Sequence, residues 1–140
     1  MASPRQQRET ILVVDDTEAV LLFVTDALEL EGYTVLSTGD PEEALAWFQA
    51  RTEPIHLLIA DVAIPRRNGP ALAKELRSID PNLKVLFMSG STAEEMAAFG
   101  LRIEAGEPCL PKPFSVGELK RAVRATLDSG PLKGGSGDTL

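Results

Sequence analysis

The stretch "ILVVDDTEA", residues 11–19, decides how this chain is interpreted, because four apolar residues lead directly into two adjacent carboxylates. An apolar run without alternation is typical of a parallel strand that is covered on both faces. Asp15 and Asp16 would then stand side by side where that strand ends. Their like charges repel each other unless a cation joins them. The residues that end the other strands therefore decide what this acidic pair binds.

The size and composition of the chain exclude several classes of protein. Its 140 residues fit one domain. A formal net charge of −7 argues against binding nucleic acid through a broad basic face and against an anionic membrane surface. The single cysteine, Cys109, excludes an internal disulfide and fits a reducing compartment. No apolar run approaches the ~20 residues of a membrane helix, and the N-terminus has no apolar signal core. We therefore expect a cytoplasmic protein or module.

Apolar runs and amphipathic segments alternate along the sequence. Besides 11–14, strands are predicted at 33–37, 56–60, 84–89 and 107–110. Helices are predicted at 17–32, 40–50, 68–78, 91–100 and 115–127. This β-α order, repeated five times, predicts an α/β fold with a doubly wound parallel sheet and helices on both faces. We expect a flexible N-terminus over 1–9, one domain over 10–128, and a Gly-rich tail or linker over 129–140.

Capping residues support three of the predicted helices. Asp40 precedes Pro41, which is a favoured helix start. Ser115 stands three residues before Glu118, the spacing of a capping box. The first predicted helical segment ends in Gly32, which suits the position just after a helix C-cap.

Reactive side chains follow most of the predicted strands. Asp15 and Asp16 follow the first strand, Asp61 the third, and Lys112 the fifth, while Ser89 ends the fourth. Each residue alone has an ordinary explanation as a turn residue, a helix cap or a surface lysine. In open α/β sheets, however, ligands bind beyond the carboxyl ends of the strands. We therefore expect three carboxylates, a hydroxyl and an ammonium to meet at one edge of the sheet.

This combination of groups indicates a magnesium site with phosphoryl chemistry. Oxygen ligands favour a hard cation, and Mg²⁺ needs only one or two carboxylates plus an incoming phosphate. The sequence contains no set of His and Cys residues for a zinc site. With a metal in place, one carboxylate can attack phosphorus and form an aspartyl phosphate. Lys112 and the Ser89 hydroxyl would then contact phosphoryl oxygens.

Four motifs, taken in order, resemble the response-regulator receiver domain of two-component signalling. They are "ILVVDD", "LLIADVAIPRRNG", "VLFMSG" and "LPKPF", and the resemblance covers about residues 10–127. The stretches "LKVLFMSG" and "CLPKPF" are most similar to receivers of hybrid histidine kinases. The resemblance implies a flavodoxin-like (βα)5 three-layer sandwich, with strand order 2-1-3-4-5 and five helices. It also implies a domain that accepts a phosphoryl group from a histidine kinase or a histidine phosphotransfer domain.

The resemblance implies a role for each residue of the predicted metal site. Asp61 stands at the phosphoacceptor position. Asp15 and Asp16 stand at the acidic pair that carries Mg²⁺ together with Asp61. Ala63 stands where a backbone carbonyl binds the metal, so that its side chain need not matter.

The resemblance implies further roles at the ends of the last two strands. Ser89 matches the switch hydroxyl, Lys112 the phosphate-contacting lysine, and Pro113 a proline that is commonly cis. Cys109 departs from the family pattern, because many receivers carry Tyr or Phe there. That ring turns inward when the hydroxyl contacts the phosphoryl group, so the usual aromatic switch is absent or altered in this chain. We expect Cys109 itself to be a buried apolar residue.

Leu21 and Leu22 lie on the first predicted helix, where receivers dock the helical bundle of their phosphodonor. Leu22 falls between Asp26 and Glu29 on the polar face, and Leu21 lies at the edge of the apolar face. A single exposed leucine is normal. The alternative hypothesis is that Leu22, with Leu21, extends the docking surface for a histidine kinase or phosphotransfer protein.

Three other functions compete with a phosphorylated signalling switch. A phosphatase of the haloacid-dehalogenase type would need a general acid two residues after Asp61, where Ala63 stands. A nucleotide- or flavin-binding domain would need a glycine-rich loop in place of "DDTEA". A degenerate receiver that acts only as an interaction module would not need all five site residues. We therefore expect a signalling domain with at most slow self-dephosphorylation, either free-standing or part of a longer protein.

Two arginines follow the predicted phosphorylation site. Arg66 and Arg67 could contact an acidic partner, but we expect them to belong to a solvated loop.

Overall fold

The computed structural model describes residues 9–90 and 107–129. The helix predicted at 91–100 lies outside the described residues, and so does most of the predicted flexible N-terminus and tail.

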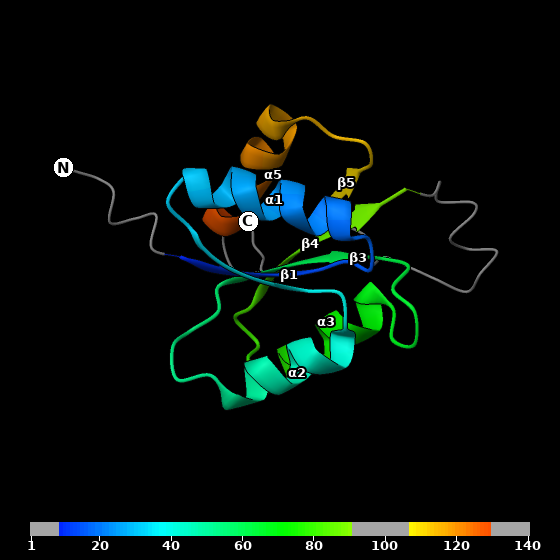
Figure 1. Cartoon of the computed structure of the whole chain (residues 1–140). Coiled ribbons are helices and arrows are strands. Elements are labelled where there is room, and N and C mark those ends of the chain that lie inside the picture. The colour runs from blue at the N-terminus through cyan, green and yellow to red at the C-terminus, as the bar shows by residue number, and fades with distance from the viewer. Residues whose placement is uncertain (1–8, 91–106, 130–140) are drawn as a thin grey trace, which may run out of the picture.

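Five parallel strands form one sheet in the order β2-β1-β3-β4-β5, which confirms the predicted fold class. The strands are β1 (Thr10–Val14), β2 (Thr34–Thr38), β3 (Leu57–Asp61), β4 (Lys84–Ser89) and β5 (Cys109–Pro111). The described helices are α1 (Glu18–Leu30), α2 (Pro41–Ala50), α3 (Gly69–Ile79) and α5 (Val116–Asp128). Helices α1 and α5 cover one face of the sheet, and α2 and α3 cover the other (Figure 1). None of these four helices is long and apolar enough to cross a membrane.

Two apolar layers pack on opposite faces of the central strands. Leu12 of β1 belongs to the layer that contains Phe48 of α2. The neighbouring Val13 belongs to the other layer, with Val24 of α1 and Leu119 of α5. All residues of β3 are buried. An uninterrupted apolar sequence is therefore required, because alternate side chains of a central strand enter different layers.

The predicted helix signals are present in the structure. The Asp40 carboxylate accepts a hydrogen bond from the N–H of Glu42 at 2.9 Å. Ser115 and Glu118 form both bonds of a capping box, at 3.0 and 2.8 Å. Gly32 has a φ of 99° immediately after the C-cap of α1, a conformation that glycine adopts without steric cost.

Gly69, the first residue of α3, packs directly against the end of β3. A Cβ added at Gly69 would overlap the carbonyl oxygen of Asp61 and lie 3.1 Å from its carbonyl carbon. The Gly69 N–H also donates to the Val62 carbonyl at 3.0 Å. Both neighbours are backbone atoms, so a side chain at this position would displace the strand end that carries Asp61.

We predict that Gly69→Ala lowers the free energy of unfolding by about 1–3 kcal/mol, because the added methyl group overpacks this junction. Urea denaturation followed by circular dichroism would measure the change. Gly90→Ala is the matched control, since a Cβ there meets no atom within 4 Å. We expect the control to remain within about 0.5 kcal/mol of the wild-type protein. Equal effects from the two substitutions would contradict the packing argument.

Candidate functional site

The first component of the site is the acidic pair at the end of β1. Asp15 is fully buried, whereas Asp16 is exposed. One carboxylate oxygen of Asp15 accepts a hydrogen bond from the Thr17 N–H at 2.8 Å. The Asp15 N–H donates to the Thr38 carbonyl at 3.2 Å, which continues the pairing of β1 with β2. These bonds fix the Asp15 side chain at the carboxyl edge of the sheet.

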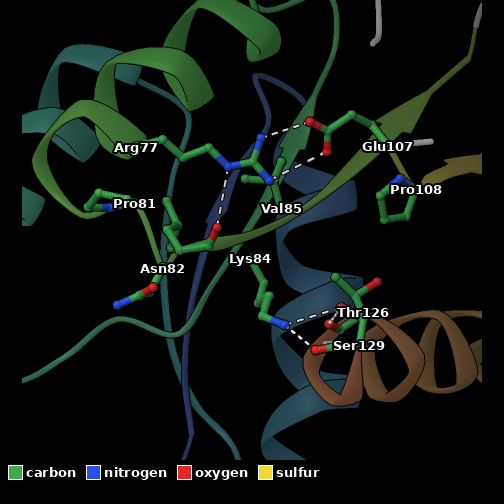
Figure 2. Close-up of a pocket in the computed structure, with 10 residues that line it drawn as sticks. Arg77, Pro81, Asn82, Lys84, Val85, Glu107, Pro108, Thr126 and Ser129 are labelled. Atoms are coloured by element: carbon green, nitrogen blue, oxygen red, sulfur yellow. Dashed lines mark hydrogen bonds and ion pairs between the residues drawn. The ribbon is translucent and has the colours of Figure 1, made fainter. Parts of the chain in front are cut away.

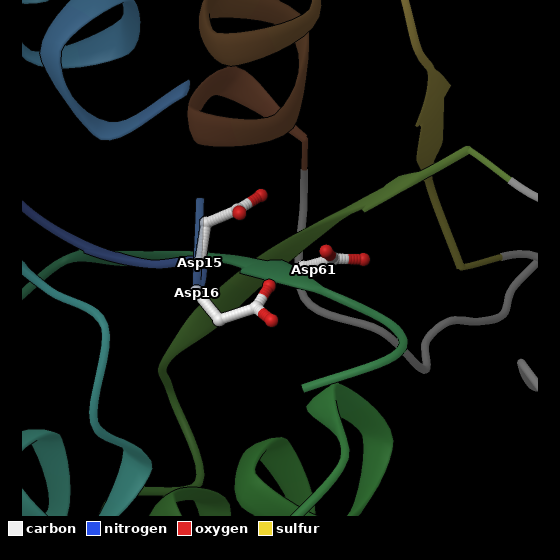
Figure 3. Close-up of side chains that lie close together, drawn as sticks. All are labelled: Asp15, Asp16 and Asp61. Carbon is white, nitrogen blue, oxygen red and sulfur yellow. The ribbon is translucent and has the colours of Figure 1, made fainter. Parts of the chain in front are cut away.

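The neighbouring strand β3 brings Asp61 to the same edge. Asp61 is buried, and its carboxylate accepts a hydrogen bond from the Ala63 N–H at 3.1 Å. One carboxylate oxygen each from Asp15, Asp16 and Asp61 lies within 4.8 Å of the other two. Figure 3 shows the three side chains at adjacent strand ends. We refer to these three residues as the acidic cluster.

The Lys112 ammonium bridges two members of the acidic cluster. Its Nζ lies 2.7 Å from Oδ2 of Asp15 and 3.1 Å from Oδ2 of Asp61. Burial lowers the pKa of Lys112, but the hydrogen bonds to these two carboxylates outweigh that effect and raise the pKa above its ordinary value. Lys112 is therefore charged at neutral pH. The Lys112–Pro113 peptide bond is cis, the isomer that the resemblance implies.

The charges of these residues suit a divalent cation. One ammonium offsets one of the three carboxylates, so the acidic cluster keeps a net negative charge. Within the described residues, the exposed Asp16 carboxylate accepts no hydrogen bond, so its oxygens are accessible to a ligand. An all-oxygen donor set of this charge can hold a hard cation such as Mg²⁺.

Ser89 ends β4 next to the strand that ends with Asp61. Asp61 is paired in register with Met88, so Ser89 stands one residue beyond that pair. Ser89 is buried, and its carbonyl accepts a hydrogen bond from the Lys112 N–H at 2.8 Å. The sheet therefore brings Asp61, Ser89 and Lys112 to one edge, as expected from the strand order.

Cys109 is exposed, so the prediction of a buried apolar cysteine is wrong. The physical reason is the position of β5 at the edge of the sheet, where side chains alternate between burial and exposure: Leu110 is buried, and Cys109 and Pro111 are exposed. Partial desolvation of the thiol, together with the nearby charge of Asp61, nevertheless raises the pKa of Cys109. A thiol with a raised pKa is a weak nucleophile at neutral pH.

Arg67 is more strongly paired than the expected solvated loop would suggest. Its side chain is 26% exposed and forms ion pairs with Glu42 of α2 and Glu75 of α3. Arg66 agrees better with the expectation, because its side chain is 68% exposed and pairs only with Asp40 among the described residues. No local pattern predicts the Arg67 pairs, since Glu42 lies 25 residues away in the sequence.

The two leucines singled out on the first helix differ in exposure. Leu22 of α1 is 58% exposed, whereas Leu21 is partly buried and packs against the core layer beneath α1 and α5. Phe23, the next residue, is 39% exposed, and its ring centroid lies 5.9 Å from that of Phe114. An exposed apolar surface is therefore present on α1 beside the segment that leads into α5.

A separate pocket of about 370 Å³ lies at the other end of β4 (Figure 2). Its charged side chains are already paired within the protein. Arg77 forms an ion pair with Glu107 at 2.7 Å, and Lys84 donates to the Ser129 hydroxyl at 3.2 Å. Lys84 begins the strand that Ser89 ends, so this pocket is remote from the acidic cluster. We assign no function to it.

A sensor kinase and a transcriptional regulatory protein are among the relatives that match most of the chain. The sensor kinase CckA of Brucella abortus is 36% identical over 119 residues, which are 85% of this chain and 12% of that protein. The alkaline phosphatase synthesis transcriptional regulatory protein PhoP of Bacillus subtilis is 35% identical over 117 residues, covering 84% of this chain and 48% of the relative. The chain thus spans half or less of the length of these relatives.

Solved structures of receiver domains have the same fold. The receiver domain of the hybrid histidine kinase CckA has a TM-score of 0.70 and 34% identity, covering 85% of this chain and 99% of that one. A CheY-like receiver domain protein from Methanospirillum hungatei has a TM-score of 0.74 and 28% identity, covering 86% and 94%. The family model described as "Response regulator receiver domain" matches residues 11–124. Together with the sheet order, these matches show that the chain belongs to the response-regulator receiver domain family of two-component signalling.

Proposed function

We propose that this domain accepts a phosphoryl group on Asp61 from a phosphohistidine, and that Mg²⁺ is required for the transfer. The phosphodonor would be a histidine kinase or a histidine phosphotransfer domain. The observation that carries the proposal is the acidic cluster with Lys112 bridging Asp15 and Asp61. Asp15, Asp16 and Asp61 would hold the cation, together with the backbone carbonyl of Ala63.

Each side chain would have a defined part in the transfer. A carboxylate oxygen of Asp61 attacks phosphorus while the bond from phosphorus to the donor histidine breaks, and an aspartyl phosphate results. Lys112 already lies within hydrogen-bond distance of Asp61, so it can donate to an oxygen of the arriving phosphoryl group. Mg²⁺, when bound, supplies positive charge that stabilises the phosphoryl oxygens in the transition state.

The Ser89 hydroxyl would report the phosphorylated state to the rest of the domain. Ser89 stands beside Asp61 on the neighbouring strand, so a phosphoryl group on Asp61 provides a new acceptor for its O–H. Cys109 stands in place of the usual aromatic ring, and a thiol is too small to exchange between two alternative packings in the same way. We therefore propose that phosphorylation changes partner binding without an aromatic switch at this position.

The exposed surface of α1 would dock the phosphodonor. Leu22 and Phe23 expose apolar area there, and the partly buried Leu21 packs against the core layer beneath the helix. The α1 helix contains Glu18, Asp26 and Glu29 but no basic residue. A partner helix with an apolar stripe flanked by Lys or Arg would fit this surface. That position would bring the donor histidine toward the carboxyl edge of the sheet, where α1 begins.

We predict that acetyl phosphate with Mg²⁺ adds one phosphoryl group to the wild-type protein and none to Asp61→Asn, because an amide cannot form the acyl phosphate. Intact-mass spectrometry would measure the product. Asp26→Asn, an exposed carboxylate on α1, is the matched control and should be labelled like the wild type. If the wild-type protein remained unlabelled, the domain would instead be an interaction module. Labelling of Asp61→Asn would place the phosphoryl group on another residue.

Magnesium binding provides a second prediction. Asp16→Asn should weaken Mg²⁺ affinity by at least about tenfold, because it removes a charged oxygen ligand from the acidic cluster. Isothermal titration calorimetry of the metal-free protein with MgCl₂ would measure the affinity. Asp26→Asn changes the net charge of the protein equally and should leave the affinity unchanged. A similar loss of affinity in both variants would mean that Asp16 acts through the overall charge of the protein and is not a ligand of the metal.

The docking surface gives a third prediction. Leu22→Glu should slow phosphotransfer from a phosphorylated histidine phosphotransfer protein by about tenfold, the effect of losing one moderate contact of an interface. Labelling by acetyl phosphate should not change, since that small donor needs no docking surface. Leu30→Glu is the matched control, because Leu30 is 86% exposed at the far end of α1. The docking hypothesis is wrong if Leu22→Glu transfers at the wild-type rate, or if both variants slow transfer equally.

A further inference from the structure

The loop that follows Asp61 connects the acidic cluster to α3. At its ends, the Val62 N–H donates to the Met88 carbonyl at 2.9 Å, and the Gly69 N–H donates to the Val62 carbonyl at 3.0 Å. Inside the loop, Ile64 is buried in the core layer that contains α2 and α3. The Arg67 N–H donates to the Pro65 carbonyl at 2.8 Å, a bond that stays within the loop. The solvent-facing side of residues 62–68 therefore depends on side-chain contacts.

Arg67 supplies contacts from this loop to two helices. Its Nε lies 2.9 Å from Oε2 of Glu42, and its Nη2 lies 2.8 Å from the same oxygen. The other terminal nitrogen donates to Glu75 of α3. A planar guanidinium can bind two carboxylates at once in fixed directions, which a lysine ammonium does less well. Arg67 thus joins the loop, the first turn of α2 and the second turn of α3.

The contact of Arg67 with α2 also links the loop to the chain segment beside Asp15. The segment just before α2 packs against Asp15: the Thr38 carbonyl accepts from the Asp15 N–H at 3.2 Å, and a Cβ on Gly39 would lie 3.3 Å from the Asp15 carbonyl oxygen. Glu42 lies in the first turn of α2. Arg67 therefore connects the loop after Asp61 to the backbone that flanks Asp15.

Arg66 provides a natural comparison within the same loop. It carries the same charge and contacts Asp40, also beside α2, at 3.1 Å. Its side chain is 68% exposed and Asp40 is 47% exposed, and an ion pair in water contributes little. The partners of Arg67 are similarly exposed, Glu42 by 52% and Glu75 by 39%, but Arg67 itself is only 26% exposed and binds two carboxylates in place of one. The position of the loop should therefore depend on Arg67 and only slightly on Arg66.

We propose that Arg67 is a positioning residue for the acidic cluster. By joining α2 and α3 across the loop, it keeps residues 62–68, and Ala63 among them, in the observed conformation beside the acidic cluster. Holding this conformation before binding reduces the conformational entropy that the loop loses when a ligand arrives. The part of this inference that concerns Mg²⁺ rests on the proposed function. The part that concerns the loop does not.

Two measurements on Arg67→Met and Arg66→Met test the proposal. In the metal-free protein, amide hydrogen exchange at Ala63 and Ile64 should become about tenfold faster in Arg67→Met and change less than twofold in Arg66→Met. Calorimetric titration with MgCl₂ should show about a tenfold loss of affinity in Arg67→Met only, the range found when groups that orient metal ligands are removed. Arg67→Lys should restore part of each property, because it keeps the charge but loses the planar fork.

Removing both carboxylate partners of Arg67 separates the effect of the ion pairs from other effects of the Arg67 substitution. In a protein that carries Glu42→Gln and Glu75→Gln, Arg67→Met should have little further effect on exchange or affinity. A lower melting temperature with unchanged exchange and affinity would overturn the proposal, because it would show a purely structural role. Equal effects of Arg66→Met would also overturn it. If the wild-type protein bound no Mg²⁺, the proposed function would fail, and the exchange measurement would decide the role of Arg67 alone.

Discussion

The contact of Lys112 with both Asp15 and Asp61 is the interaction on which the site depends. Two carboxylates held at the ends of neighbouring buried strands would repel each other, and the ammonium offsets part of that repulsion. Lys112 and Asp15 are 97 residues apart in sequence. The sheet brings these charges together, because β1 lies beside β3 and the carboxyl end of β5 lies at the same edge. The fold and the electrostatics of the site therefore support each other.

The same balance of charge gives the site its chemical character. Lys112 does not neutralise the acidic cluster, and the exposed Asp16 keeps an open carboxylate beside the two buried ones. An anionic phosphoryl group would be repelled by this residual charge, whereas a divalent cation would be attracted by it. We therefore expect the cation to make phosphoryl transfer electrostatically favourable, as the proposed function requires. Lys112 can donate hydrogen bonds both before and after a phosphoryl group arrives, because an ammonium has three donors and binds either carboxylate or phosphoryl oxygens.

Much of this arrangement could be predicted from the sequence, because it follows from local patterns and parallel topology. Uninterrupted apolar runs predicted the central strands, and their ends located Asp15, Asp61 and Ser89. Lys112 was located by the less apolar segment that forms the edge strand β5. Two features could not be predicted in this way. The exposure of Cys109 depends on its strand being short and at the sheet edge, and the apolar context of the sequence does not reveal this. The pairing of Arg67 depends on how α2 packs beside α3, which no local spacing encodes.

The loops at the carboxyl edge are fixed to the sheet in similar ways at their first residues, and they differ in the contacts that hold their outer parts. The residues after β1 are held by main-chain bonding to β2 and by the Asp15–Thr17 turn. Lys112 is held by the main chain of β4 through the Ser89 carbonyl. The segment after β3 is held in the same way, by the bond from the Val62 N–H to the Met88 carbonyl and by the bond from the Ala63 N–H to the Asp61 carboxylate. Its outer part differs, because Arg67 joins it to two helices. Substitution of Arg67 can therefore change the position of the loop without disturbing the strands, because Arg67, unlike Val62 and Ile64, belongs to neither apolar layer.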